Sequence, residues 1–255
     1  MKKLIAGHVN SDNINGLGVI EFYHPQSNSL PGEVLRQLAE AITRAGNDPE
    51  VKVILLKSYG EKTFCAGASF DELASIRDEV EGKQFFMGFA HVINAMRKAP
   101  KFIIGRVQGK CVGGGVGLAA AVDYCIATEA ADIKLSELAI GLGPFVVGPA
   151  VERKIGTASF SQLAINAGSW QKSTWARDKG LFSELHPGIE EMNFAVEKLA
   201  GSLLLSNPDA MAEMKKICWA GTEHWDELLA SRAAISGKLV LSEYTRNAVD
   251  RLRTK

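Results

Sequence analysis

Short apolar runs alternate with longer amphipathic segments over about the first 187 residues of the chain. Residues 16–25, 51–58 and 101–109 are rich in β-branched and aromatic side chains, a pattern that predicts buried strands. Residues 31–47 and 83–98 carry apolar side chains at helical spacing, and we expect helices there. Strands that alternate with helices predict an α/β layered domain.

The pattern changes after about residue 187, where the strand signal stops. The rest of the chain predicts three helices over residues 190–206, 208–220 and 225–253, the last of them broken near Gly237. We therefore expect a core domain over residues 1–190 and a C-terminal helical region over residues 191–255.

Composition narrows the class of protein. The 255 residues include 29 Lys and Arg against 29 Asp and Glu, and this balance gives no sign of a nucleic-acid-binding surface. The four cysteines (Cys65, Cys111, Cys125 and Cys218) form no CxxC pair, so we expect reduced thiols. The five histidines are scattered, and we expect no metal site.

Long apolar stretches are missing from the sequence. None approaches the roughly 20 residues of a membrane-spanning helix. The apolar run near residue 1 is also shorter than the roughly 7–15 residues of a secretory signal. We therefore expect a cytoplasmic protein with no membrane partner.

The segment GGGVGLAAAVDYC, residues 113–125, places three glycines between an expected strand and a buried helix. Open N–H groups at such a helix start favour negative charge, and glycine lets a ligand approach the backbone. A tight turn packed on another element is the alternative. The pattern Gly115-x-Gly117-x-x-Ala120 also matches a dinucleotide fingerprint, with Glu137 20 residues beyond Gly117. The helix is too short for that reading, at about eight residues.

A second turn of small residues lies in FCAGASFDEL, residues 64–73. Ser69 with Glu72 three residues later has the spacing of a capping box, which predicts a helix start. Two such turns after two strands suggest two backbone N–H groups that converge on one oxygen atom. That is the design of an oxyanion hole.

The segment KLSELAIGLGP, residues 134–144, holds one carboxylate among apolar side chains. Glu137 is therefore paired, exposed at a turn, or an acid/base group with a raised pKa. The residues alone leave these roles open. Phe145, Val146 and Val147 follow, and they form either the wall of a pocket or plain core.

These three segments, in this order and spacing, resemble the crotonase family of enoyl-CoA hydratases and isomerases. HPQSNSLP (residues 24–31) and NPDAMAEMKK (residues 207–216) extend the resemblance over nearly the whole chain. It implies a spiral of ββα units with C-terminal helices that build a homotrimer or a hexamer. It also implies an acyl-CoA thioester substrate and no separate cofactor.

The resemblance assigns roles by position. It places the oxyanion N–H groups on Ala68 and Gly114, and the catalytic acid/base on Glu137. It further implies substrate or CoA contacts for five residues: Asn28, Ala66, Gly67, Ser69 and Gly113. Asp71 stands where many members have a lysine near the CoA adenine or phosphates, so that contact is not expected here.

One residue departs from the family pattern. Hydratases of the family commonly use two glutamates, and the first falls on Gly117. Glu137 could then be the sole acid/base of a hydratase, or could shuttle a proton between C2 and C4 as an isomerase. A finer resemblance, to members with glycine there and "SE" at the second site, favours hydration of 3-methylglutaconyl-CoA in leucine breakdown. A CoA-ester-binding protein without hydration activity is the remaining alternative.

Overall fold

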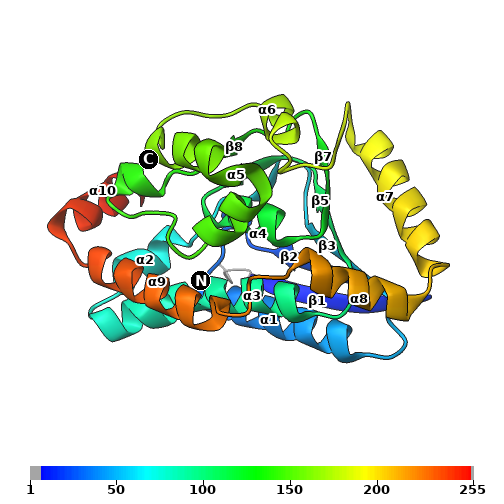
Figure 1. The fold of residues 1–255 in the computed structure, drawn as a ribbon. Coiled ribbons are helices and arrows are strands. Elements are labelled where there is room, and N and C mark those ends of the chain that lie inside the picture. The colour runs from blue at the N-terminus through cyan, green and yellow to red at the C-terminus, as the bar shows by residue number, and fades with distance from the viewer. Residues whose placement is uncertain (1–6, 254–255) are drawn as a thin grey trace, which may run out of the picture.

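The computed structural model describes residues 7–253, and a six-stranded sheet forms its centre (Figure 1). The strand order is β1-β2-β3-β5-β7-β9, with β1 antiparallel to β2 and every other pair parallel. The strands of this sheet are β1 (His8–Ile14), β2 (Leu17–Tyr23), β3 (Val53–Ser58), β5 (Ile103–Val107), β7 (Tyr124–Thr128) and β9 (Glu184–His186).

A second, smaller parallel sheet has the order β4-β6-β8. It consists of β4 (Thr63–Cys65), β6 (Lys110–Val112) and β8 (Ile133–Lys134). The chain enters the large sheet with β3, β5 or β7, crosses to the small sheet with the next strand, and then forms a helix. The expected spiral of ββα units is confirmed.

Ten α-helices and one 3₁₀ helix complete the described residues. They are α1 (Gly32–Asn47), α2 (Phe70–Ser75), α3 (Glu79–Lys98), α4 (Gly114–Ala121), η1 (Glu137–Ile140), α5 (Gly148–Ile165), α6 (Ser173–Asp178), α7 (Ile189–Leu204), α8 (Pro208–Cys218), α9 (Trp225–Leu239) and α10 (Glu243–Arg253).

Two local expectations need correction, and one strand was not expected. Helix α3 begins before residue 83, because the Asp78 side chain accepts hydrogen bonds from the N–H groups of Val80 and Glu81. The break in the last helical segment lies between α9 and α10, and Gly237 itself stays helical. Strand β1 was not expected, because its side chains are mostly polar and exposed and only one edge is paired.

The central strands of the large sheet are buried on both faces. Along β3, Ile54 and Leu56 point into the main core, whereas Val53 and Leu55 pack in a second cluster with residues of α7. This explains why residues 51–58 form a continuous apolar run rather than an alternating one.

The C-terminal helices pack on the rest of the chain. Helix α9 runs along α3, and α10 contacts α2 and η1 (Figure 1). Trp225, Leu229 and Ala233 of α9 belong to the main core. The division of the chain near residue 190 stays a prediction.

Within residues 7–253, every helix is too short or too polar to cross a membrane. Residues 1–6, on which the expectation about a secretory signal depends, lie outside the described residues.

Candidate active site

Three loops that follow the three strands of the small sheet form the candidate site. Residues 66–68 follow β4, residues 113–114 follow β6, and residues 136–137 follow β8. Because the strands are parallel neighbours, their carboxyl ends meet at one edge of the sheet. All three loops line one pocket there.

The first two loops touch through their backbones. Gly67 has φ +86°, and a Cβ atom there would lie 2.8 Å from the carbonyl oxygen of Val112. It would also lie 3.3 Å from the backbone nitrogen of Gly114. No side chain fits at this position, so glycine is required for the two turns to meet.

Two N–H groups are left open where these turns meet. Ala68 forms a parallel bridge with Leu30, but the bridge uses the carbonyl of Gly67 and the N–H of Ser69. Gly114 is the first residue of α4, so its N–H has no acceptor within the helix. Over residues 7–253, neither the Ala68 nor the Gly114 N–H has a backbone or side-chain acceptor. Both residues line the pocket.

Each of the three consecutive glycines has its own steric reason. Gly113 has φ +51°, and a Cβ atom there would lie 3.0 Å from Oε1 of Glu137. A Cβ atom at Gly114 would overlap the ring of Phe89, and one at Gly115 would overlap the carbonyl oxygen of Cys65. The glycines therefore serve close packing, and access of a ligand to the backbone stays a prediction.

Glu137 supplies the one carboxylate. It is the first residue of η1, which ends at Gly141 in the left-handed conformation. Its Oε2 atom is buried, and no group in residues 7–253 forms a hydrogen bond with it. Burial raises the pKa of this carboxyl group to about 7. Of the states that the residues left open, the structure shows a carboxylate with a buried, unpartnered oxygen and a raised pKa, and the acid/base role itself stays a prediction.

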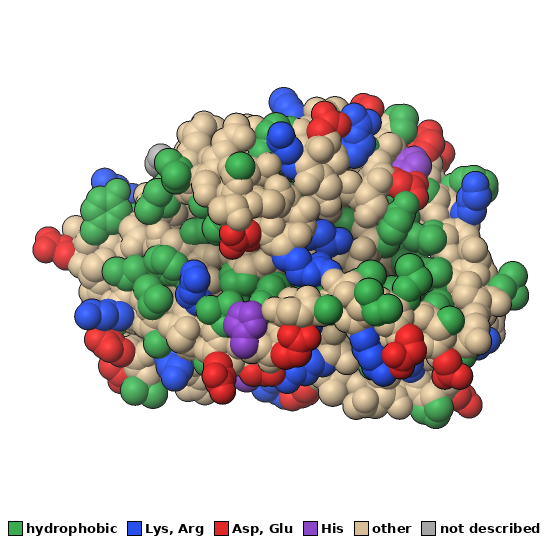
Figure 2. All heavy atoms as spheres, viewed as in Figure 1, with side chains coloured by type: hydrophobic (Ala, Val, Ile, Leu, Met, Phe, Trp, Pro, Cys, Tyr) green, Lys and Arg blue, Asp and Glu red, His purple; other side chains and the backbone are tan. Residues whose placement is uncertain are grey.

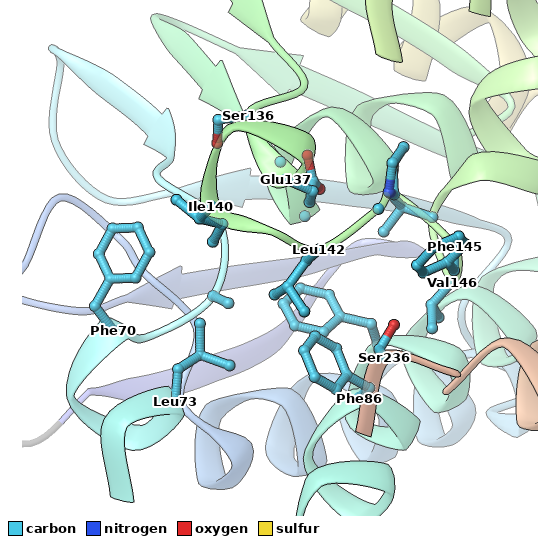
Figure 3. Close-up of a pocket in the computed structure, with 18 of the residues that line it drawn as sticks. Phe70, Leu73, Phe86, Ser136, Glu137, Ile140, Leu142, Phe145, Val146 and Ser236 are labelled. Carbon is cyan, nitrogen blue, oxygen red and sulfur yellow. The ribbon is translucent and has the colours of Figure 1, made fainter. Parts of the chain in front are cut away.

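The rest of the pocket wall is apolar (Figure 3). Its hydrophobic side chains come from Phe70, Leu73, Phe86, Phe89, Ile140, Leu142, Pro144, Phe145, Val146 and Val147. Glu137 is the only ionisable side chain among the described residues that line this pocket, and Ser136 and Ser236 are the other polar ones. On the face shown in Figure 2, hydrophobic side chains gather in the hollow between α5 and α9, with charged side chains of both signs around it.

Some of these wall residues were not predicted from the sequence to line a pocket. Phe145, Val146 and Val147 were expected as wall or core, and they line the pocket. Phe86 and Phe89 lie on the expected apolar face of α3, but helical spacing does not distinguish core from pocket. Ser236 gave no signal, because one serine in a helix has no characteristic pattern.

Gly117 packs against one residue of this wall, Val147. A Cβ atom there would lie 2.5 Å from Cγ1 of Val147. A glutamate at position 117 is therefore incompatible with Val147 in this position. The dinucleotide interpretation finds no support here, since α4 has only eight residues and the Glu137 carboxylate faces Gly113.

Two expected ligand-binding residues lie outside the pocket wall and support the first turn. The Asn28 side chain donates hydrogen bonds to the carbonyls of Tyr59 (2.8 Å) and Thr63 (3.0 Å), which precede the turn. Ser69 caps α2 by accepting a hydrogen bond from the N–H of Glu72. The Glu72 carboxylate does not close the capping box, because it accepts a hydrogen bond from the N–H of Gly32 instead. Direct CoA contacts of Asn28 and Ser69 stay predictions.

Comparison with known proteins decides the family. The family model described as "Enoyl-CoA hydratase/isomerase" matches residues 12–246. The chain belongs to the enoyl-CoA hydratase/isomerase family. It is 27% identical to the short-chain-enoyl-CoA hydratase of Clostridium acetobutylicum, over 91% of this chain and 89% of that one. It is 25% identical to the carnitinyl-CoA dehydratase of Proteus mirabilis, over 86% and 89% of the two chains.

Solved structures of the enoyl-CoA hydratase/isomerase family share the fold. The crystal structure of enoyl-CoA hydratase from Bacillus halodurans superposes with a TM-score of 0.88 at 21% identity. The superposition covers 96% of this chain and 99% of that one. This likeness confirms the expected crotonase-type α/β architecture with C-terminal helices.

Proposed function

We propose that this chain is a hydratase that adds water to a 2-enoyl-CoA thioester, with Glu137 as its one acid/base group. The observation that carries the proposal is the unpartnered, buried Oε2 of Glu137 in the same pocket as two N–H groups without acceptors. Buried polar atoms normally have partners, so these three atoms favour a ligand with oxygen and transferable protons.

The geometry suggests how charge would be stabilised. The thioester oxygen would accept hydrogen bonds from the N–H groups of Ala68 and Gly114. As the oxygen of water bonds to C3, the π electrons of the double bond move toward the thioester oxygen, which becomes enolate-like. Backbone donors fixed before the reaction stabilise this charge without reorganisation.

Glu137 would move the proton. Its carboxylate takes one proton from the attacking water and then gives it to C2, so the carboxylate is regenerated and the double bond is lost. A general acid/base works best when its pKa lies near the working pH, and burial brings the pKa of Glu137 to about 7. Both protonation states are then accessible at neutral pH.

A second candidate reaction is isomerisation of an enoyl-CoA. Glu137 is the only ionisable group among the described residues that line the pocket, and Val147 fills the space beside Gly117. Movement of a double bond needs one base that takes a proton from C2 and returns it at C4, with no bound water. This observation favours an isomerase as the alternative.

The acyl group is a finer part of the proposal. The resemblance to the methylglutaconyl subgroup makes 3-methylglutaconyl-CoA, and thus leucine breakdown, a candidate. Its distal carboxylate would enter a pocket in which no described residue contributes a cationic side chain. Burial of an unpaired carboxylate is costly, so the reaction with this substrate is a demanding test of the subgroup assignment.

A paired assay tests these alternatives. Wild type and Glu137→Gln receive crotonyl-CoA, 3-methylglutaconyl-CoA and 3-hexenoyl-CoA, and mass spectrometry follows the products. A gain of one water that Glu137→Gln loses supports the hydratase. A double-bond shift without a mass change supports the isomerase. Ligand-induced stabilisation without any turnover would leave only the CoA-ester-binding alternative.

Assembly and compartment are also proposals. We infer a homotrimer or a dimer of trimers, because the family resemblance implies C-terminal helices that mediate association. A cytoplasmic location is a separate proposal and rests on the sequence expectation given above. Light scattering coupled to size-exclusion chromatography would show the mass of three or six copies. A monomer would overturn this proposal.

A further inference from the structure

One hydroxyl lies buried in the pocket far along the chain from the catalytic loops. Ser236 belongs to α9, lines the pocket, and is only 1% exposed. Figure 3 shows its oxygen directed toward the space between Leu142 and Phe145. Glu137 enters the same pocket from η1, on the other side of Leu142 in this view.

Ser236 occupies a position where packing alone would favour an apolar side chain. It shares the buried face of α9 with Leu229 and Ala233, and the buried Val240 follows the helix as its C-cap. A buried hydroxyl in such a place lowers stability unless it is well hydrogen-bonded. Packing therefore does not explain a serine at this position, and a functional role of its hydroxyl would.

The hydroxyl is weakly satisfied within the protein. Among residues 7–253 its one hydrogen bond runs to the carbonyl of Arg232 in the same helix, at 3.4 Å. Good O–H···O bonds are about 2.7–2.8 Å long, so this one is at the limit. The hydroxyl can rotate to donate to a better acceptor, and no group in the described part of the chain donates to its lone pairs.

The position of Ser236 is fixed by its neighbour. Gly237 lies against Gly82 of α3, where a Cβ atom on Gly82 would be 2.7 Å from the carbonyl oxygen of Gly237. The two helices are therefore in backbone contact beside the pocket. A polar group held by such contact is prearranged for a ligand, which lowers the entropy cost of binding.

We propose that the Ser236 hydroxyl binds an oxygen atom at the distal end of the acyl group, so that the site prefers acyl-CoA thioesters with an oxygenated tail. This inference rests on the proposed function, since it assumes that a CoA thioester lies with its carbonyl at Ala68 and Gly114. The distal oxygen is either neutral, as in a hydroxyl, or part of a carboxylate. Both accept a hydrogen bond from serine, and the test distinguishes them.

Binding of matched saturated ligands tests the proposal without turnover. Calorimetry gives the Kd of 5-hydroxypentanoyl-CoA against hexanoyl-CoA, and of glutaryl-CoA against 5-methylhexanoyl-CoA. Each pair differs only in the distal oxygen atoms. We expect wild type to favour at least one oxygenated ligand, and Ser236→Ala to reduce that Kd ratio about tenfold. The pair that responds identifies the neutral or the anionic tail.

Ser231→Ala is the matched control. Ser231 lies on the same helix and also bonds to a carbonyl of α9, that of Leu228 at 2.8 Å, but it is exposed and outside the pocket. This variant should keep both Kd ratios. Ratios near one in wild type, or ratios that Ser236→Ala leaves unchanged, would overturn the inference. Turnover of crotonyl-CoA by wild type is judged separately, so failure of the proposed function would be distinguishable.

Discussion

Gly117 and Val147 fit together: a Cβ atom on Gly117 would lie 2.5 Å from Cγ1 of Val147, whose side chain lines the pocket. The resemblance to crotonases places one glutamate of the family's hydratases at position 117, and in this chain Val147 occupies the space that such a side chain would need. Gly117 thus leaves room for Val147, and Val147 forms part of the pocket wall.

The contact between Gly117 and Val147 predicts that a glycine-to-alanine substitution in this helix lowers the free energy of unfolding, which is the reverse of the usual effect. Glycine to alanine inside a helix normally stabilises a protein by roughly 0.5–1 kcal/mol. Gly117→Ala should instead destabilise by about 1–3 kcal/mol, because the buried methyl group overlaps Val147. Urea unfolding measures the effect, and Val147→Ala in the same chain should remove most of it.

Gly201→Ala provides the control for that experiment. Gly201 is an exposed residue of α7, and a Cβ atom there meets nothing within 4 Å. The Gly201→Ala substitution should raise the free energy of unfolding by the usual amount of roughly 0.5–1 kcal/mol. If Gly117→Ala behaves in the same way as Gly201→Ala, the steric account of position 117 is wrong.

Gly113 should be required for activity because a side chain there would displace Glu137, and not only because of its backbone conformation. Gly113→Ala strains a residue with φ +51° and places a Cβ atom 3.0 Å from Oε1 of Glu137. We expect kcat/KM for crotonyl-CoA to fall by about 10²-fold or more, as for a displaced catalytic group. Gly221→Ala bears similar strain at φ +82° with open space around it, so it should lose stability and keep activity. Equal activities of the two variants would contradict this role.

The pKa of Glu137 predicts a pH-dependent stability difference. Below pH 4.5 the carboxyl group is protonated in both the folded and the unfolded chain. As pH rises to about 7, the unfolded chain releases this proton while the folded chain retains it, so wild type loses stability. Relative to wild type, Glu137→Gln should therefore gain on the order of 3 kcal/mol between pH 4 and pH 8. Parallel stability curves for the two proteins would rule out the raised pKa.

A buried ion pair anchors helix α8, and its removal should lower the free energy of unfolding strongly. Lys215 is 2% exposed, and its Nζ lies 2.8 Å from Oδ2 of Asp123. Lys215→Ala leaves Asp123 without its ion-pair partner and should cost about 3–5 kcal/mol in unfolding free energy. Lys216→Ala breaks the adjacent exposed pair with Glu213 and should cost below about 1 kcal/mol. Similar losses in both variants would argue against this anchor.

Local periodicity was sufficient for the elements that bury a continuous apolar stripe. Residues 31–47 and 51–58 formed the expected helix and strand because their patterns match their burial. Strand β1 escaped because its seven residues are mostly exposed, and the two- and three-residue strands of the small sheet are too short to show a period. The site loops were found through small residues and one carboxylate. Ser236 was not, because only packing of α9 on α3 brings it to the pocket.

The central claim is that Glu137 moves a proton at C2 of a thioester held by the N–H groups of Ala68 and Gly114. The most direct test is the rate at which deuterium from D₂O enters C2 of the acyl group while crotonyl-CoA and 3-hydroxybutyryl-CoA interconvert. We predict incorporation by wild type and a loss of about 10³-fold in Glu137→Gln, with the Kd for butyryl-CoA unchanged. Equal rates in both proteins, or no incorporation by wild type, would contradict the account.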